Sequence, residues 1–119
     1  MRRLFTTFGL LISLPIMAGD AKLAAAVTAL QSPESVVIDV RTAEEFAAGA
    51  LPRAEQIDYG QIANRISAIA PDKATPIVLY CRSGRRSSVA EESLRTLGYS
   101  NLINAGSYDE LKLALESQD

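Results

Sequence analysis

Cys81 is the only cysteine of the chain, and three arginines follow it within five residues, in the stretch YCRSGRRSS, residues 80–88. The apolar run of residues 77–80 is typical of a buried strand, and a helical pattern begins near Ser87. Backbone N–H groups of a tight loop and of a helix N-terminus point towards the loop centre, and the helix dipole adds about half a positive charge there. The pattern predicts a stabilised thiolate at Cys81.

The arginines and the glycine of this loop support the same interpretation. Arg82, Arg85 and Arg86 add positive charge, and cysteine pKa values in such surroundings fall from about 8.5 to between roughly 3.5 and 7.5. Gly84 permits a positive φ or the close approach of a ligand. We therefore expect a nucleophilic sulfur that attacks an anionic substrate. The residues leave one alternative open, a small buried core cysteine beside solvated arginines.

The composition limits which other chemistry is possible. With 119 residues, 48% of them hydrophobic, the chain fits one compact domain. It contains no histidine, which excludes a Ser-His-Asp or Cys-His pair and removes the commonest neutral metal ligand, so we expect no metal and no cofactor. The formal charge is -2 and no basic face recurs, so nucleic acid is not an expected partner.

The N-terminus has the pattern of a secretory signal peptide. Arg2 and Arg3 precede an apolar run, residues 4–18, that ends in small residues. A retained membrane anchor is the alternative interpretation. However, the run is shorter than the roughly 20 residues that span a bilayer, and Pro15 interrupts it.

We expect residues 1–18 to be removed and residues 19–119 to form a periplasmic, monomeric domain with no stable membrane association. The candidate cleavage positions follow three small residues: Ala18, which we favour, Gly19 and Ala21. A mature chain with one cysteine cannot form an internal disulfide. Cys81 is therefore buried and inert, paired with another molecule, or a working thiol.

Expected strands and helices alternate along the mature chain. Short apolar, β-branched runs predict strands at residues 36–40, 56–57, 77–80 and 101–104. Helical periodicity and cap residues predict helices at residues 20–30, 42–49, 61–70, 87–98 and 107–116. The alternation indicates parallel βαβ units, hence a three-layer α/β domain whose mostly parallel sheet has helices on both faces.

Some side chains are expected to begin helices or to face the core. Thr42, with Glu45 three residues later, has the pattern of a capping box. Asp20 and Ser107 are expected to cap the first and last helices. In the helix after the cysteine loop, the residues expected to face inward are Val89, Leu94 and Leu97.

Ligands of parallel sheets bind at the carboxyl ends of the strands, where Cys81, Asp39 and Arg41 are expected. Three segments, spread along the chain in the expected order, carry a resemblance to a known family: VVIDVRTAEEF, IVLYCRSGRRS and LRTLGYSNLINAG. Over about residues 22–116 the chain resembles a single-domain rhodanese, a thiosulfate sulfurtransferase, and is similar to the small exported phage-shock-protein-E type. The resemblance implies the rhodanese-like fold.

The resemblance also implies residue roles. Cys81 would take the outer sulfur of thiosulfate or a similar donor, form a persulfide and pass the sulfur to cyanide or to a thiol. Arg82 and Arg86 would orient the sulfonate of the donor. The loop that holds the persulfide and the substrate would consist of Arg82, Ser83, Gly84, Arg85, Arg86 and Ser87. Asp39, Arg41 and Glu45 would support the loop, with Glu45 as a partner for an arginine.

Loop length separates this activity from its nearest alternative. Related phosphatases and arsenate reductases need Cys-x5-Arg, whereas Arg86 here gives Cys-x4-Arg, a smaller ring that suits sulfur transfer. Two other interpretations keep the same residues: a noncatalytic sulfur-carrier or redox-sensing module, and a binding protein for sulfur oxyanions. The chain departs from the family after the first of the three segments, where Ala50 replaces a common histidine and Arg53 a common glycine.

Overall fold

The computed structural model describes residues 18–118 of the chain. The predicted signal peptide thus lies outside the described residues, except for Ala18. The helices are α1 (Ala18–Leu30), α2 (Ala43–Ala48), α3 (Ile62–Ile69), α4 (Arg85–Thr96) and α5 (Tyr108–Glu116). The strands are β1 (Val36–Asp39), β2 (Glu55–Gln56), β3 (Ile77–Cys81) and β4 (Leu102–Ser107). None of the described helices is long and apolar enough to cross a membrane.

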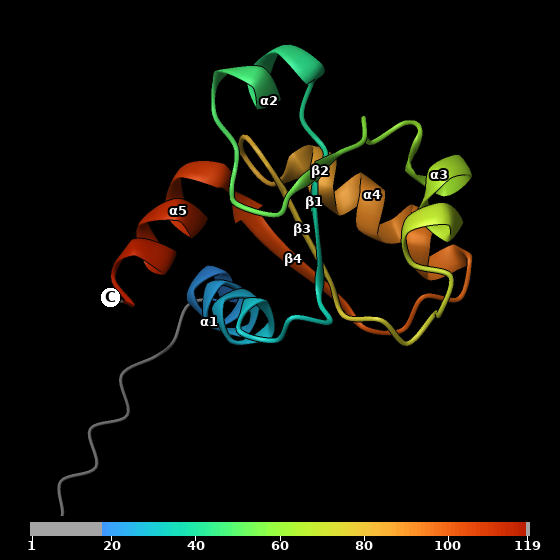
Figure 1. The fold of residues 1–119 in the computed structure, drawn as a ribbon, viewed down its shortest axis with the longest axis horizontal. Helices are drawn as coiled ribbons and strands as arrows, with labels where there is room; N and C mark the ends of the chain where they lie inside the picture. The colour runs from blue at the N-terminus through green and yellow to red at the C-terminus, as the bar shows by residue number, and fades with distance from the viewer. Residues whose placement is uncertain (1–17, 119) are drawn as a thin grey trace, which may run out of the picture.

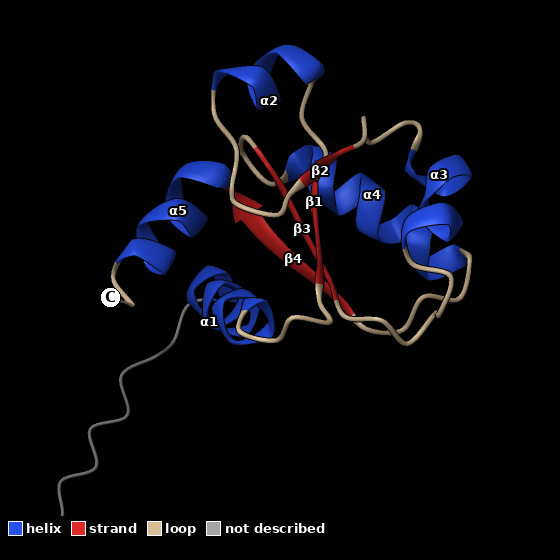
Figure 2. Ribbon diagram, in the orientation of Figure 1, coloured by secondary structure: helices blue, strands red, loops and turns tan. Residues whose placement is uncertain are grey.

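The four strands form one parallel sheet in the order β2-β1-β3-β4. Figure 1 shows α1 and α5 on one face of this sheet and α3 and α4 on the other. Figure 2 shows the short helix α2 beyond the carboxyl end of β1. The expected three-layer α/β architecture is therefore confirmed, and every strand pair in the described sheet is parallel.

Side chains of β3 alternate between the two halves of the core, because successive residues of a strand point to opposite faces. Leu79 and Cys81 belong to the buried cluster on the α3 and α4 side. Val78 and Tyr80 belong to the cluster on the α1 and α5 side. All five residues of β3 are buried, as its continuous apolar sequence predicts. The alternation directs the Cys81 thiol towards the start of α4.

Two of the three predicted helix caps are confirmed. Thr42 Oγ1 accepts a hydrogen bond from Glu45 N (3.1 Å), and Glu45 Oε1 accepts one from Thr42 N (2.9 Å), which completes the capping box. Ser107 Oγ caps α5 by accepting from Glu110 N (3.3 Å). The cap predicted at Asp20 is wrong, because α1 already begins at Ala18. Neither of the two residues before Asp20 is a proline, so nothing stops the helix from extending to them.

The buried face of α4 also differs from the prediction. Val89 and Leu97 are 46% and 37% exposed, so only Leu94 of the predicted inward residues faces the core. The buried stripe consists of Ser87, Ala90 and Leu94. These positions are three and four residues apart, as expected for one helix face. Ser87 and Ala90 have small side chains, so the start of α4 packs closely against the sheet. The buried face of this helix is therefore not the one that carries its largest apolar residues.

Candidate active site in the cysteine loop

Cys81 is the last residue of β3, and only three residues separate it from the start of α4 at Arg85. The residue is fully buried. Gly84 N donates a hydrogen bond to Cys81 Sγ (2.7 Å), and Ser87 Oγ lies 3.4 Å from the same sulfur. Gly84 is the N-cap of α4 and has a φ of +98°. The left-handed conformation at Gly84 thus accompanies an amide hydrogen that points at the sulfur, as the sequence pattern predicts.

This arrangement lowers the pKa of Cys81 from its ordinary value of 9.0. Burial is the largest single influence and raises the pKa, because it disfavours the charged thiolate. Hydrogen bonds from the Ser87 hydroxyl and from the backbone N–H groups of Ser87, Gly84 and Ser83 outweigh burial. The charge of the three arginines was expected to lower this pKa as well. In the structure, hydrogen bonds within the loop are the main cause.

Arg86 is held by an ion pair with α2. Its Nη1 lies 3.0 Å from Glu45 Oε1 and its Nη2 lies 3.3 Å from Glu45 Oε2, a bidentate arrangement. Mainly because of the bond to Arg86, and also because of the bond to Thr42 N, the pKa of Glu45 falls from 4.5 to about 2. The structure thus places Glu45 against an arginine of the loop, and both nitrogens of the Arg86 fork are engaged by this carboxylate.

The arginines of the loop do not line one common cavity. Arg82 is exposed and lines a cavity of about 360 Å³ with Arg41, Glu45, Ala48, Gly49, Tyr108, Asp109 and Lys112. Arg86 lines a separate cavity of about 290 Å³ with Val40, Thr42, Asp58, Tyr59, Gly60 and Gln61. Arg85 is exposed, and its side chain makes no hydrogen bond or ion pair with another described residue. Among residues 18–118, neither Arg82 nor Lys112 forms an ion pair, so both charges are available to an anion.

Asp39 and Arg41 form a buried pair on the opposite face of the sheet from the thiol. Arg41 Nε and Nη2 donate to Asp39 Oδ1 (2.9 Å) and Oδ2 (2.6 Å). Arg41 Nη2 also donates to Gly49 O (2.6 Å), and the guanidinium carbon lies 4.3 Å from the centre of the Tyr108 ring. The hydrogen bond to Asp39 raises the pKa of Arg41. The pair therefore joins β1 to the end of α2 and to α5.

Asn104, in β4, lies beside the thiol and was not among the predicted site residues. It is 5% exposed, and its Oδ1 accepts from Ser87 Oγ (2.7 Å) and from Gly106 N (2.9 Å). Its Nδ2 donates to Ser88 Oγ (3.0 Å). The signal available in the sequence was an asparagine within a short apolar strand, because asparagine is depleted in strands. Asn104 connects β4 to the start of α4 beside the thiol.

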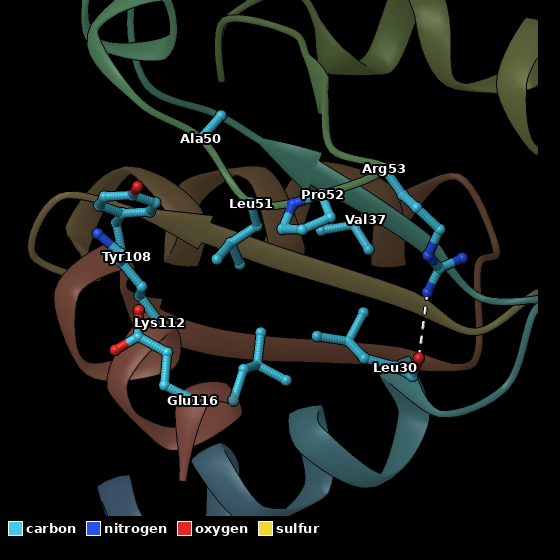
Figure 3. A pocket seen from close by; sticks show the side chains of 10 residues that line it. Leu30, Val37, Ala50, Leu51, Pro52, Arg53, Tyr108, Lys112 and Glu116 are labelled. Carbon is cyan, nitrogen blue, oxygen red and sulfur yellow. Dashed lines mark hydrogen bonds between the residues drawn. The ribbon is translucent and has the colours of Figure 1, made fainter. Parts of the chain in front are cut away.

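A further cavity, of about 400 Å³, lies on the α1 and α5 side of the sheet (Figure 3). Mostly apolar side chains line it, including Leu30, Leu51 and Leu115, and no residue of the cysteine loop is among them. Arg53 lies at one end, has a φ of +69°, and donates to Leu30 O (3.2 Å). Tyr108 and Lys112 line both this cavity and the one beside Arg82. The apolar cavity therefore adjoins the cavity beside Arg82 but is not lined by the cysteine loop.

The chain is similar to several known proteins of one family. The family model described as Rhodanese-like domain matches residues 23–114. Thiosulfate sulfurtransferase PspE of Escherichia coli K12 is 33% identical over 76 residues, which are 64% of this chain and 73% of that protein. A sulfurtransferase of Allochromatium vinosum is 39% identical over 69 residues, and the match covers 58% of this chain and 63% of that protein. The structure of the human single-domain sulfurtransferase TSTD1 superposes with a TM-score of 0.66 at 29% identity, covering 76% and 92% of the two chains.

Proposed function

The chain belongs to the rhodanese family of sulfurtransferases, and from this premise we propose that Cys81 carries sulfur as a persulfide between thiosulfate, or a similar anionic donor, and a thiol or cyanide. The observation that carries the proposal is the hydrogen bond from Gly84 N to Cys81 Sγ in a Cys-x4-Arg loop. The only cysteine of the chain has a lowered pKa, so its nucleophilic form is favoured without a histidine base.

In the first half of the reaction, the Cys81 thiolate attacks the outer sulfur of thiosulfate. The new bond joins Cys81 Sγ to that sulfur, the sulfur–sulfur bond of the donor breaks, and its electron pair leaves with sulfite. The terminal sulfur of the resulting persulfide carries negative charge. Inward-pointing N–H groups of the loop, of which Gly84 N is the clearest, stabilise such an anion through preorganised dipoles.

In the second half, an acceptor removes the sulfur. Cyanide or a thiolate attacks the terminal sulfur of the persulfide, and the bond between this sulfur and Cys81 Sγ breaks. The electron pair returns to Sγ, which regenerates the thiolate and releases thiocyanate or an acceptor persulfide. The bonds that lower the pKa of Cys81 also make it a better leaving group in this step.

Positive charge next to the loop suits an anionic donor. Arg82 and Lys112 line the same cavity, and neither forms an ion pair within the described part of the chain. Two free cations at one cavity raise the local concentration of a doubly charged donor. Arg86 takes part only when the donor displaces the Glu45 carboxylate from it, so Arg82 is the first contact.

We also propose that the protein is exported and works in the periplasm. The support is the basic and apolar N-terminal pattern of residues 1–18. Accurate mass measurement of the protein purified from the periplasmic fraction tests this. A mature chain beginning at Gly19 is expected, and a full-length chain found only in the membrane or cytoplasmic fraction would contradict export.

The test of the sulfur-transfer proposal is a two-step mass measurement. Residues 19–119 are incubated with thiosulfate, and the intact mass is recorded before and after addition of cyanide. We expect a gain of one sulfur atom that disappears with cyanide as thiocyanate forms, and we expect Cys81→Ser to show neither change. A wild-type protein that never gains the sulfur would overturn the proposal. Sulfur that loads but does not pass to cyanide would instead indicate a sulfur carrier.

A further inference from the structure

We propose that Asn104 is a positioning residue of the site, because it competes with the Cys81 sulfur for the single hydroxyl proton of Ser87. Its role in sulfur transfer rests on the function proposed above, whereas its effect on the thiol does not. Ser87 Oγ lies 2.7 Å from Asn104 Oδ1 and 3.4 Å from Cys81 Sγ. Gly84 O, 3.1 Å from Ser87 Oγ, is a third acceptor. A hydroxyl has one proton to donate, so it serves only one of the three acceptors at a time, and Asn104 Oδ1 is the nearest.

The neighbours of Asn104 determine which way its amide faces. A backbone N–H can only donate, so the atom of Asn104 that lies 2.9 Å from Gly106 N must be the amide oxygen. The amide nitrogen then faces Ser88 Oγ at 3.0 Å, and that hydroxyl donates in turn to Gly84 O (2.9 Å). Every group in this chain of hydrogen bonds has a consistent direction. The oxygen of Asn104 therefore faces Ser87 and accepts its proton.

The position of this proton depends on the charge of the sulfur. When Cys81 is a neutral thiol, Ser87 donates to Asn104 and its lone pairs face Sγ, where they can accept from S–H. When Cys81 is a thiolate, the hydroxyl must rotate from Asn104 to the sulfur in order to stabilise the negative charge. Asn104 therefore sets how much that rotation costs. In the reaction cycle the rotation coincides with the return of the electron pair to Sγ.

An irregularity in β4 gives Asn104 this geometry. Leu79 pairs with Asn104 and Tyr80 pairs with Gly106, so the register shifts by one residue between these pairs. Such bulges redirect side chains and occur next to active sites. Gly106 has a φ of +84°, which a glycine tolerates. The bulge brings Gly106 N within hydrogen-bond reach of the Asn104 side chain, two residues earlier in the strand. It leaves the Asn104 amide oxygen next to Ser87, which is fully buried.

The thiol pKa tests the proposal without requiring any sulfur transfer. It is measured from the pH dependence of alkylation by iodoacetamide, a neutral reagent. Ser87→Ala removes the donor, so alkylation at a fixed pH below the thiol pKa should slow by roughly tenfold. Asn104→Leu removes the nearer of the two oxygens that compete with the sulfur and leaves Gly84 O, so alkylation should become only roughly threefold faster. Ser93→Ala is the matched control, because Ser93 is half-buried on the same helix and its hydroxyl donates only to Val89 O.

The double variant separates the proposed role from a merely structural one. If Asn104 acts through Ser87, Asn104→Leu should change the alkylation rate in the wild-type background and have no effect in the Ser87→Ala background. Two results would overturn the proposal. One is an equal effect of Asn104→Leu on the alkylation rate in both backgrounds, and the other is slower alkylation in the single variant Asn104→Leu than in wild type. Circular dichroism confirms that each variant is folded.

A second substitution keeps the test decisive if Asn104→Leu does not fold. Asn104→Asp retains both acceptor bonds and binds the Ser87 proton more strongly, so alkylation should slow. Part of this slowing is direct charge repulsion, which persists without Ser87. The slowing should therefore be smaller in the Ser87→Ala background, and an undiminished effect there would contradict the proposal. If the Asn104 variants do not change the alkylation rate as described, the inference about Asn104 is wrong. If the wild-type protein forms no persulfide with thiosulfate, only the proposed function is wrong.

Discussion

The Arg86 guanidinium and the Glu45 carboxylate form a bidentate ion pair that links the cysteine loop to α2, at 3.0 and 3.3 Å. About a quarter of each side chain is exposed, so water and salt reach the pair. Such pairs typically contribute about 0–1 kcal/mol to stability. The same carboxylate completes the capping box of α2 through Thr42. Glu45 therefore links the start of α2 to the positive charge of the cysteine loop.

Glu45 should make folding stability depend on pH in the acidic range. The pKa of Glu45 is about 2 in the folded protein, below its ordinary 4.5. A lowered carboxylate pKa stabilises the protein above the unfolded value and loses that contribution as the pH falls through the folded value. Wild type should lose this contribution between about pH 4.5 and 2, as measured by melting temperature. Glu45→Gln should lose less over that range. Glu91→Gln, which breaks an exposed pair with Arg95, controls for the loss of one charge.

The same variant should bind the donor more tightly. Glu45→Gln leaves Arg86 without its partner, while glutamine still supports a capping box. The KM for thiosulfate should therefore fall, by up to about fivefold, which corresponds to the usual strength of such a pair. Steady-state kinetics with cyanide measures this. A KM that rises would show that Glu45 positions Arg86 for the donor and does not compete with it.

Much of the fold could be predicted from the sequence, because strong local signals agreed with one another. Continuous apolar runs mark β1 and β3, and the capping box at Thr42 marks the start of α2. Weak signals were less accurate. β2 has only two residues and begins one residue before its predicted position, and β4 extends three residues beyond it. Pairing with a neighbouring strand, and not local sequence, determines where these strands begin and end.

The site was predicted where residues are adjacent in sequence and missed where tertiary contacts assemble it. Cys81, Gly84 and Ser87 lie within seven consecutive residues, so their proximity could be inferred from spacing alone. Asn104 reaches Ser87 only because of the bulge in β4. Lys112 shares a cavity with Arg82 only because the fold brings residues of α2, α5 and the loop to line it together. Neither relationship leaves a pattern in the local sequence.

Gly84→Ala should destabilise the protein through backbone strain. A residue with a side chain pays about 1–2 kcal/mol in the left-handed conformation that Gly84 adopts. An added Cβ would lie 3.5 Å from Gly106 Cα, an ordinary contact, so steric overlap adds little. The melting temperature should fall by about 4–8 °C for each kcal/mol. Gly60→Ala is the control, because its Cβ would meet no atom within 4 Å, and it should melt near wild type.

Lys112→Glu should weaken binding of the donor without changing the thiol. Lys112 lines the cavity beside Arg82, so reversing its charge repels a dianion on its approach. The KM for thiosulfate should rise severalfold at low ionic strength and approach the wild-type value at high salt, because salt screens exposed charges. Arg65→Glu makes the same change of charge on exposed α3, across the sheet. An equal rise in KM for both variants would indicate a general charge effect and not a site at Lys112.

Arg53 combines a strained backbone with useful side-chain contacts, and two substitutions separate them. Its φ of +69° costs a residue with a Cβ about 1–2 kcal/mol, whereas its guanidinium donates to Ser35 O (3.1 Å), Ser35 Oγ (3.2 Å) and Leu30 O (3.2 Å). Arg53→Ala removes the contacts and keeps the strain, so it should lower the free energy of unfolding. Arg53→Gly removes both and should be more stable than Arg53→Ala by about 1 kcal/mol. Chemical denaturation measures the difference. Equal stability of the two variants would show that the backbone at residue 53 relaxes once the guanidinium is gone.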